Sequence, residues 1–268
     1  MRKTIIGCII FLGNITQGLY AQELFVLTEP ASNMPKGSIG IRSMNSMMFQ
    51  KNGKLNYHQM PELMWGIHQK WMLHIQSFAS SRQNGGLVHE GFSIYNKFRF
   101  LSIDDFNSHF RLAAYQRISL NNAEIHQEEI ETMGHNSGNE IGLIATQLIN
   151  KNALNFTTSF EQIFSSQKNA ILYYKGLNYT LSYGRLIYPK KYTHFKQTNI
   201  NLMVELLGQN LLGSEKNFLD IAPSIQFIIN SQMRIDIAYR AALYSNMSRT
   251  APNGAILKFE YTFFNLKK

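Results

Sequence analysis

The sequence contains almost no cysteine and few charged residues. Its 268 residues include a single cysteine, Cys8, and only 16% charged residues, against about 25% in an average soluble domain. One cysteine excludes an internal disulfide scaffold and a thiolate metal cluster. After residue 21 no stretch approaches the ~18 consecutive apolar residues that a membrane-spanning helix needs. These absences argue against a cytosolic enzyme, a disulfide-rich domain and a helical membrane protein.

The first 21 residues have the layout of a secretory signal peptide. A short basic region at residues 2–3 precedes an apolar core at residues 5–12, and Ala21 stands before the expected cleavage point. Cleavage there removes Cys8. The sequence therefore predicts a signal peptide at 1–21 and an exported single domain at 22–268.

Apolar and polar residues alternate with a period of two along nearly the whole of that domain. Between residues 234 and 243, for example, Ile235, Ile237 and Tyr239 fall on one face, and the charged residues fall on the other. About twelve such runs are present, several of them longer than the ~5–6 residues of a typical globular strand and close to the ~9–11 that cross a bilayer at a tilt. They centre near residues 42, 62, 75, 95, 114, 144, 158, 179, 202, 224, 239 and 260.

So much strand is unusual for a soluble domain but expected of a closed barrel. In hydrocarbon every backbone donor and acceptor must be paired internally, so strands span a membrane only when their sheet closes on itself. A soluble double-layer β protein would bury its apolar face only once and would seldom carry aromatics on nearly every strand. The sequence thus predicts an all-β fold, a transmembrane antiparallel up-and-down β-barrel of about twelve strands.

The connections between the runs alternate in length, as in outer-membrane barrels with short periplasmic turns and longer outer loops. One connection, residues 188–196, is long for the short-turn side. Short links are expected at 67–70, 102–107, 150–152 and 230–232, and longer polar stretches at 50–56, 80–89, 121–138, 208–217 and 244–254.

The final run, Ala255-Ile-Leu-Lys-Phe-Glu-Tyr-Thr-Phe-Phe264, resembles the C-terminal strand of bacterial outer-membrane barrels that the barrel-assembly machinery reads, although residues 265–268 follow its last aromatic. Within that class the chain is similar to uncharacterised transporter-like barrels near the phenol-degradation-pathway outer-membrane family. The stretches at 25–35, 61–66 and 108–114 carry this resemblance. It implies passive transport of small solutes across the outer membrane and supplies no catalytic residues.

By the alternation, the charged residues of the expected strands point into the barrel, because a charge on the lipid face would cost roughly 2–4 kcal/mol at mid-bilayer. Two interpretations stay open: a charged conduit that orients a passing solute, or a structural barrel plugged by its own salt bridges. The candidate lumen-lining residues are Arg42, Glu62, His74, Lys97, Arg99, Arg111, Arg117, Glu140, Glu205, Asp220, Arg234, Asp236, Arg240, Lys258 and Glu260.

Catalytic signals are weak. The chain has no Gly-x-Ser-x-Gly, His-Glu-x-x-His or Gly-x-x-x-x-Gly-Lys motif. Residues 134–138, Gly-His-Asn-Ser-Gly, resemble a hydrolase turn in composition but have the wrong spacing. A lipid hydrolase at the membrane edge therefore stays a minor alternative, and neither a catalytic residue nor a cofactor is assigned.

Methionine and histidine are concentrated in the first quarter of the chain, where thioether and imidazole groups would suit soft copper ions. Methionine is also a common apolar filler, alternate positions here face lipid, and Met-x-x-Met does not recur as a repeated series, so no metal site is assigned. The acidic stretch at 124–135 could hold a hard cation or a His-bound metal, but its composition favours a solvated acidic loop. The residues concerned in the first quarter are Met34, Met44, Met47, Met48, Met60, Met64, Met72, His58, His68 and His74.

The basic residues are scattered, so the pI near 9.5 indicates no nucleic-acid surface. The expected partners are outer-membrane lipid, lipopolysaccharide phosphates that meet basic residues at the rim, the assembly machinery and a small solute.

Overall fold

The computed structural model describes residues 25–50, 53–81, 86–125, 127–164, 174–191 and 196–264. The expected signal peptide and its cleavage point lie outside these ranges. No helix in the described part of the chain is long and apolar enough to cross a membrane.

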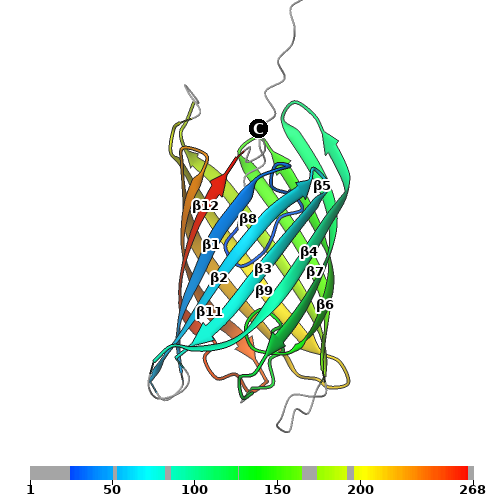
Figure 1. Cartoon of the computed structure of the whole chain (residues 1–268), viewed down its shortest axis with the longest axis vertical. Helices are drawn as coiled ribbons and strands as arrows, with labels where there is room; N and C mark the ends of the chain where they lie inside the picture. Colours follow the sequence, from blue (N-terminus) through cyan, green and yellow to red (C-terminus); the bar gives the residue numbers. More distant parts are fainter. Residues whose placement is uncertain are drawn as a thin grey trace, which may run out of the picture.

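Twelve strands of 10 to 17 residues make up the described fold. Each strand is antiparallel to its neighbours, their order follows the chain, and β1 pairs with β12 to close the sheet into a barrel (Figure 1). The prediction of a closed twelve-stranded antiparallel barrel is confirmed. The strands are β1 (Ile39–Phe49), β2 (Leu55–His68), β3 (Trp71–Ser80), β4 (Val88–Asp104), β5 (Ser108–Asn121), β6 (Gly138–Ile149), β7 (Asn152–Ile163), β8 (Lys175–Tyr188), β9 (Asn199–Leu211), β10 (Asn217–Ile229), β11 (Met233–Ser245) and β12 (Asn253–Phe263).

Side chains alternate between the two surfaces of the wall. In β11, Ile237 is 48% exposed on the outside, whereas Asp236 and Ala238 beside it are 0% and 4% exposed and face inward. Outward positions are mostly apolar, which is the surface that hydrocarbon requires. Aromatic side chains gather on this outer face near the end where β1 begins: Trp65, Trp71, Phe98, Tyr261 and Phe263.

The two ends of the barrel differ in their connections. At the end where β1 begins, turns of two or three residues join β2 to β3, β4 to β5, β6 to β7 and β10 to β11. Asn150 and Asn230 adopt positive φ in two of these turns, a conformation that asparagine tolerates. The link from β8 to β9, residues 189–198, is the long exception that the sequence predicted.

The opposite end, here called the loop end, carries the longer connections. The predicted boundaries there are wrong in one place, since β9 continues to Leu211 and the loop begins only at residue 212. On the turn side, the link predicted from residue 102 likewise begins only after Asp104. The sequence analysis did not predict one further loop-end connection, residues 164–174, although it predicted the strands on both sides of it.

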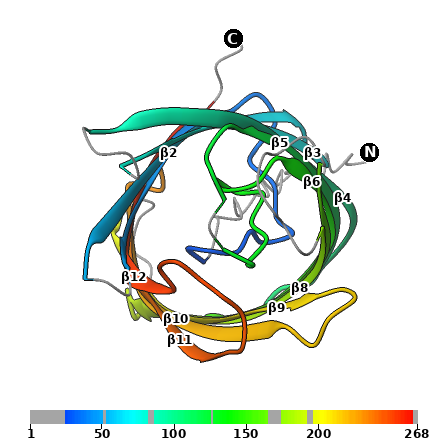
Figure 2. The same cartoon turned by 90° about the horizontal axis from the view of Figure 1, so that it is seen from below.

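Two segments that are not strands lie inside the barrel (Figure 2). The first, residues 25–38, precedes β1 and is here called the plug. The second, residues 127–137, belongs to the connection between β5 and β6 and is here called the inward loop. Viewed along the barrel, both cross the space enclosed by the strands, so the interior is occupied by chain.

The plug enters β1 through a close backbone contact with β2. Gly37 N–H donates to the carbonyl of Gly66 at 2.7 Å, and Gly66 N–H donates to the carbonyl of Ser38 at 3.0 Å. A Cβ on Gly66 would lie 2.2 Å from the Pro35 carbonyl oxygen. Only glycine permits this approach, so Gly66 fixes where the plug turns into the wall.

Candidate functional site in the barrel lumen

Glu205 holds the start of the plug. It faces inward from β9, and its register partners on the neighbouring strands are small, Ser182 and Ala222, which leaves room for backbone. Its carboxylate accepts the N–H of Val26 at 2.8 Å, that of Leu27 at 3.0 Å and that of Thr28 at 2.8 Å. Three backbone donors on one buried carboxylate form an anion cradle, so the plug is tied to the wall by charge-assisted hydrogen bonds.

Two buried lysines hold the carbonyl groups of the plug. Lys97 Nζ, on β4, donates to the carbonyls of Pro30 and Ser32, each at 2.8 Å. Lys258 Nζ, on β12, donates to the carbonyl of Val26 at 2.9 Å. Both ammonium groups are thereby paired with backbone dipoles, which stabilises them at 0% and 4% exposure.

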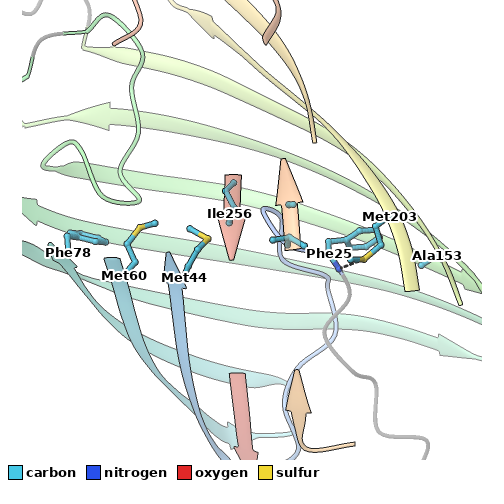
Figure 3. Close-up of a cluster of buried hydrophobic side chains, with 9 residues drawn as sticks. Phe25, Met44, Met60, Phe78, Ala153, Met203 and Ile256 are labelled. Atoms are coloured by element: carbon cyan, nitrogen blue, oxygen red, sulfur yellow. Dashed lines mark hydrogen bonds between the residues drawn. The ribbon is translucent and has the colours of Figure 1, made fainter. Parts of the chain in front are cut away.

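The apolar end of the plug packs against the wall. Phe25 is fully buried beside Met203 of β9, and its backbone N–H points at the Met203 sulfur at 3.2 Å (Figure 3). Gly184 leaves the space that the Phe25 ring fills, since a Cβ there would lie 3.4 Å from a ring carbon. Burial of such a side chain contributes roughly 1.5–3 kcal/mol to keeping the plug in place.

A lattice of charges connects the plug to four strands. Arg42 of β1 donates to Glu29 of the plug at 2.7 Å, to Glu62 of β2 at 3.0 Å and to Glu260 of β12 at 2.9 Å. Arg234 of β11 shares Glu260 at 3.0 Å. All but Glu29 of these groups are less than a tenth exposed, so water screens their attraction only weakly.

A second charge cluster, here called the arginine lattice, fastens the inward loop. Glu129 of that loop accepts from Arg240 of β11 at 2.9 Å and from Arg249 at 2.7 Å. Arg249 and Arg240 both also donate to Asp220 of β10, at 2.6 and 2.7 Å. Burial alone would raise the pKa of Glu129, but the two guanidinium groups outweigh it and hold that pKa below its ordinary value.

The tip of the inward loop rests on two carboxylates. Glu140 of β6 and Glu161 of β7 are direct cross-strand partners on the inner face. The hydroxyl of Thr132 lies 2.8 Å from Glu161 and 3.2 Å from Glu140, and the Thr132 N–H donates to Glu161 at 3.0 Å. Gln209 of β9 donates to the carbonyl of Ile130 at 2.6 Å and accepts its N–H at 2.9 Å. The inward loop is therefore hydrogen-bonded on both sides.

Two cavities lie between plug, inward loop and wall in the described part of the barrel. One has a volume of about 190 Å³ and is bordered by Glu29, Arg42 and Glu140 among others. The other has a volume of about 320 Å³ and reaches from Met60 to Gln50 and Thr250 at the loop end. At about 30 Å³ per water these volumes correspond to roughly six and ten waters, so each is a small space within the described part of the barrel.

The predicted lumen residues lie on the inner face, and all but Arg99 contact one another, the plug or the inward loop. All are buried except Arg99 and Arg240, which are partly exposed. Arg99 lies near the turn end, where it donates to the carbonyl of Gln69 at 3.0 Å, away from the plug. Arg111 joins Asp104 to Ser32 of the plug at 2.9 and 2.8 Å. Arg117 pairs with Glu140 at 3.4 Å, and His74 contacts Glu62 at 2.6 Å.

Several residues of these clusters were missed by sequence reasoning. Glu161 could have been found, since it continues the inward alternation of β7. Glu29, Glu129 and Arg249 lie outside the strands, where alternation says nothing about direction. The interpretation of residues 124–135 as a solvated loop is wrong in its second half: Glu129 pairs with two arginines, and Ile130 and Thr132 are 2% and 0% exposed.

The lumen offers no catalytic arrangement at the turn-like stretch 134–138. The Ser137 hydroxyl accepts the N–H of Asn121 at 2.8 Å and donates to its carbonyl at 2.9 Å, so it fastens the loop to β5. Among the described residues no group of three or more His, Asp or Glu side chains is arranged to hold a metal ion.

Comparison with known proteins bears on the fold. Neither a scan against protein-family models nor a search of curated proteins found a match. Among solved structures, the COG4313 outer membrane channel from Pseudomonas putida F1 is similar, with a TM-score of 0.54 and 11% identity over 87% of this chain and 98% of that one. The KdgM porin has a TM-score of 0.47 and 9% identity over 84% and 99% of the two chains. At these identities the likeness shows the fold, that of an outer-membrane barrel.

A closed barrel with an apolar outer surface and internally paired strands has the architecture that bacterial outer membranes contain. The outer-membrane location expected from the sequence follows from this architecture.

Proposed function

We propose that the protein is a passive outer-membrane channel for small solutes, closed in this state by its plug and its inward loop. The observation that carries the proposal is the nature of the obstruction. The lumen contains two segments, one that continues into β1 and one that joins β5 to β6, and both are held inside by hydrogen bonds and ion pairs. Such segments can move without disturbing the strand pairing that keeps the barrel in the membrane.

The width of the barrel supports this function. Eight strands give an interior that side chains alone fill, whereas larger strand numbers leave space. Here, with twelve strands, two extra segments lie in the space that the strands enclose. When they are displaced, a path opens that is lined by charges of both signs, including Arg42, Glu62, Arg117 and Glu140. A lining of this kind favours small polar solutes over apolar ones.

A structural barrel with a permanently plugged lumen is the competing function, and the dense bonding of the plug favours it. The described state alone is compatible with both. The two functions differ in whether the plug or the inward loop leaves the lumen under ordinary conditions. Because solute can pass only when a segment moves, a flux measurement distinguishes the two functions. A membrane-edge lipid hydrolase receives no support from the lumen groups, because the Ser137 hydroxyl is bonded within the loop.

The resemblance to barrels near the phenol-degradation-pathway outer-membrane family is part of this proposal. It implies transport of small solutes across the outer membrane. The expected partners remain outer-membrane lipid, lipopolysaccharide, the assembly machinery and the transported solute. Basic residues near the loop end, such as Lys54 and Lys216, would meet lipopolysaccharide phosphates.

Solute flux into proteoliposomes tests the function. Vesicles that contain the purified barrel should admit small sugars and amino acids slowly, and Glu129→Gln, which weakens the arginine lattice, should accelerate entry several-fold. Arg99→Gln, at the rim and away from both segments, serves as the matched charge-removal control and should leave the rate near that of the wild type. Flux no greater than that of empty vesicles for every variant would favour the plugged structural barrel.

A further inference from the structure

Methionine and histidine side chains meet at one place on the inner wall. Met44 of β1 and Met60 of β2 are direct cross-strand partners and both face the lumen, where their side chains lie next to each other (Figure 3). His58 is the next inward residue of β2, towards the loop end. Cross-strand partners on one face have Cβ atoms about 4.5–5.5 Å apart, so two thioethers and an imidazole share a small area of wall.

The inward loop brings two more groups of the same kind to this area. Met133 packs against the cluster that contains Met44 and Met60. The ring centre of His135 lies 4.8 Å from that of His58, with the planes at 55°. The loop approaches closely at Gly134, where a Cβ would lie 3.3 Å from the Met60 sulfur. Residues 75 positions apart in the chain therefore form one cluster, here called the Met/His cluster: Met44, Met60, Met133, His58 and His135.

The Met/His cluster borders an open space. All five residues line the cavity of about 320 Å³ that reaches the loop end. This distinguishes them from a second group of methionines, Met34, Met64 and Met72, which are 5%, 0% and 0% exposed, pack against one another and border neither of the two lumen cavities. Met44 and Met60 also pack with apolar residues such as Phe78 and Ile256, but unlike the second group they border a cavity that an ion can enter.

The geometry of the two imidazoles fits a shared ion. Two histidines that bind one metal through nitrogens at about 2 Å, with a near-tetrahedral angle between them, have ring centres roughly 5 Å apart. The carboxylate of Glu131 lies 2.5 Å from Nδ1 of His135, within the inward loop. A carboxylate that fixes the orientation of a histidine ring from one nitrogen is the usual support of a metal-binding imidazole.

We propose that the Met/His cluster binds one soft monovalent cation, Cu(I) or Ag(I), inside the lumen. Thioether sulfur and imidazole nitrogen together select soft ions, and the absence of a three-carboxylate or three-histidine group among the described residues gives hard divalent ions no comparable site. The sequence pattern argued against a site because Met-x-x-Met does not recur as a series and because alternate positions of this region face lipid. Met44, Met60, Met64 and Met72 are buried on the inner face, in phase with the charged lumen positions of the same strands. The ligands come from two strands and a loop, so no linear motif is needed.

Binding would also join the inward loop to β1 and β2, because the ion takes donors from both. An occupied site adds a further tie to the loop beside the arginine lattice. Binding of the cation does not itself require the barrel to conduct, so its test is separate from the flux experiment.

Isothermal titration of the full-length mature barrel in detergent tests the site, with Ag(I) nitrate in chloride-free buffer as the probe. We expect one ion per chain with micromolar or tighter affinity. Met44→Leu/Met60→Leu, which keeps the side-chain volume, should weaken binding at least 100-fold, and His58→Phe should weaken it at least 10-fold. Met64→Leu/Met72→Leu is the matched control and should bind like the wild type.

Absence of stoichiometric binding by the wild type would overturn the site, as would an equal loss of affinity in both methionine pairs. The gel mobility of each unheated variant shows whether it has folded. If a variant does not fold, X-ray absorption of the Cu(I)-loaded wild type tests the site instead. Sulfur together with nitrogen scatterers around copper supports the site, and a shell of oxygen alone contradicts it.

Discussion

Removal of the Glu205 carboxylate should release the plug while leaving the barrel assembled. In Glu205→Ala, the N–H groups of Val26, Leu27 and Thr28 lose an acceptor at 2.8–3.0 Å. A hydrogen bond to a charged group contributes about 1.5–3 kcal/mol, so three of them amount to roughly 4–9 kcal/mol before other changes. Relief from burying a lone carboxylate offsets several kcal/mol of this. A remaining destabilisation of about 2 kcal/mol corresponds to a roughly 30-fold larger population of released plug.

Accessibility of a cysteine on the plug measures that population. Cys8 is the only cysteine and falls in the expected signal peptide, so Thr28→Cys introduces a single thiol at a position that is 7% exposed. Its rate of reaction with a polar maleimide should rise about 30-fold when Glu205→Ala is added, following the population estimate above. Glu161→Ala removes a buried lumen carboxylate that contacts the inward loop instead of the plug, and it should change the rate less than about 3-fold.

Equal labelling rates in the Thr28→Cys chain with and without Glu205→Ala would refute the anchoring role of Glu205. An equal acceleration by Glu205→Ala and Glu161→Ala would show instead that loss of any lumen carboxylate loosens the whole interior. The heat-dependent gel mobility of each variant confirms that the wall itself has formed before the rates are compared.

Three further outcomes are expected. Ile237→Arg should impair membrane assembly, measured as heat-shifted protein in the outer-membrane fraction, because it places a guanidinium against lipid at about 2–4 kcal/mol; wild-type yield would show that the facing of β11 is wrong. The lowered pKa of Glu129 means that its contribution to holding the inward loop is complete above its ordinary pKa of 4.5 and is lost as pH falls through the lowered value. Conductance events should therefore become more frequent at strongly acid pH, less so in Glu129→Gln, whose neighbours Asp220, Arg240 and Arg249 are unchanged; the same pH response in both chains would contradict this. Gly66→Ala should loosen the plug at its junction with β1, because the added Cβ meets the Pro35 carbonyl at 2.2 Å; an unchanged Thr28→Cys labelling rate would contradict that contact.

The wall of the barrel was predictable from the sequence because lipid and lumen impose opposite demands on successive residues. Ile237 and Asp236 could be assigned to faces without any knowledge of neighbours, since a two-residue period leaves a single arrangement that keeps charge out of hydrocarbon. The same argument placed Arg240 inside, where its Nε donates to Asp220 at 2.7 Å.

The contents of the lumen were not predictable in this way. Glu29 and Glu129 lie in segments without strand periodicity, and their positions depend on partners far away in the chain: Arg42 for the first, Arg240 for the second. Alternation gives the direction of Glu205 but does not reveal that its carboxylate accepts three backbone N–H groups of the plug. Residues 25–38 reach β9 only once the barrel has closed. Their place in the polar interior therefore could not be predicted from the local sequence pattern.

A disulfide between plug and wall gives the most direct test of a channel closed by its own segment. The Thr28 and Ser182 hydroxyl oxygens are 3.0 Å apart, so Thr28→Cys/Ser182→Cys places two thiols within bonding reach in a chain that otherwise lacks them. Planar-bilayer recordings should show no discrete conductance from the oxidised protein and discrete steps from the same protein after reduction. Identical recordings before and after reduction, whether silent or conducting, would contradict the account.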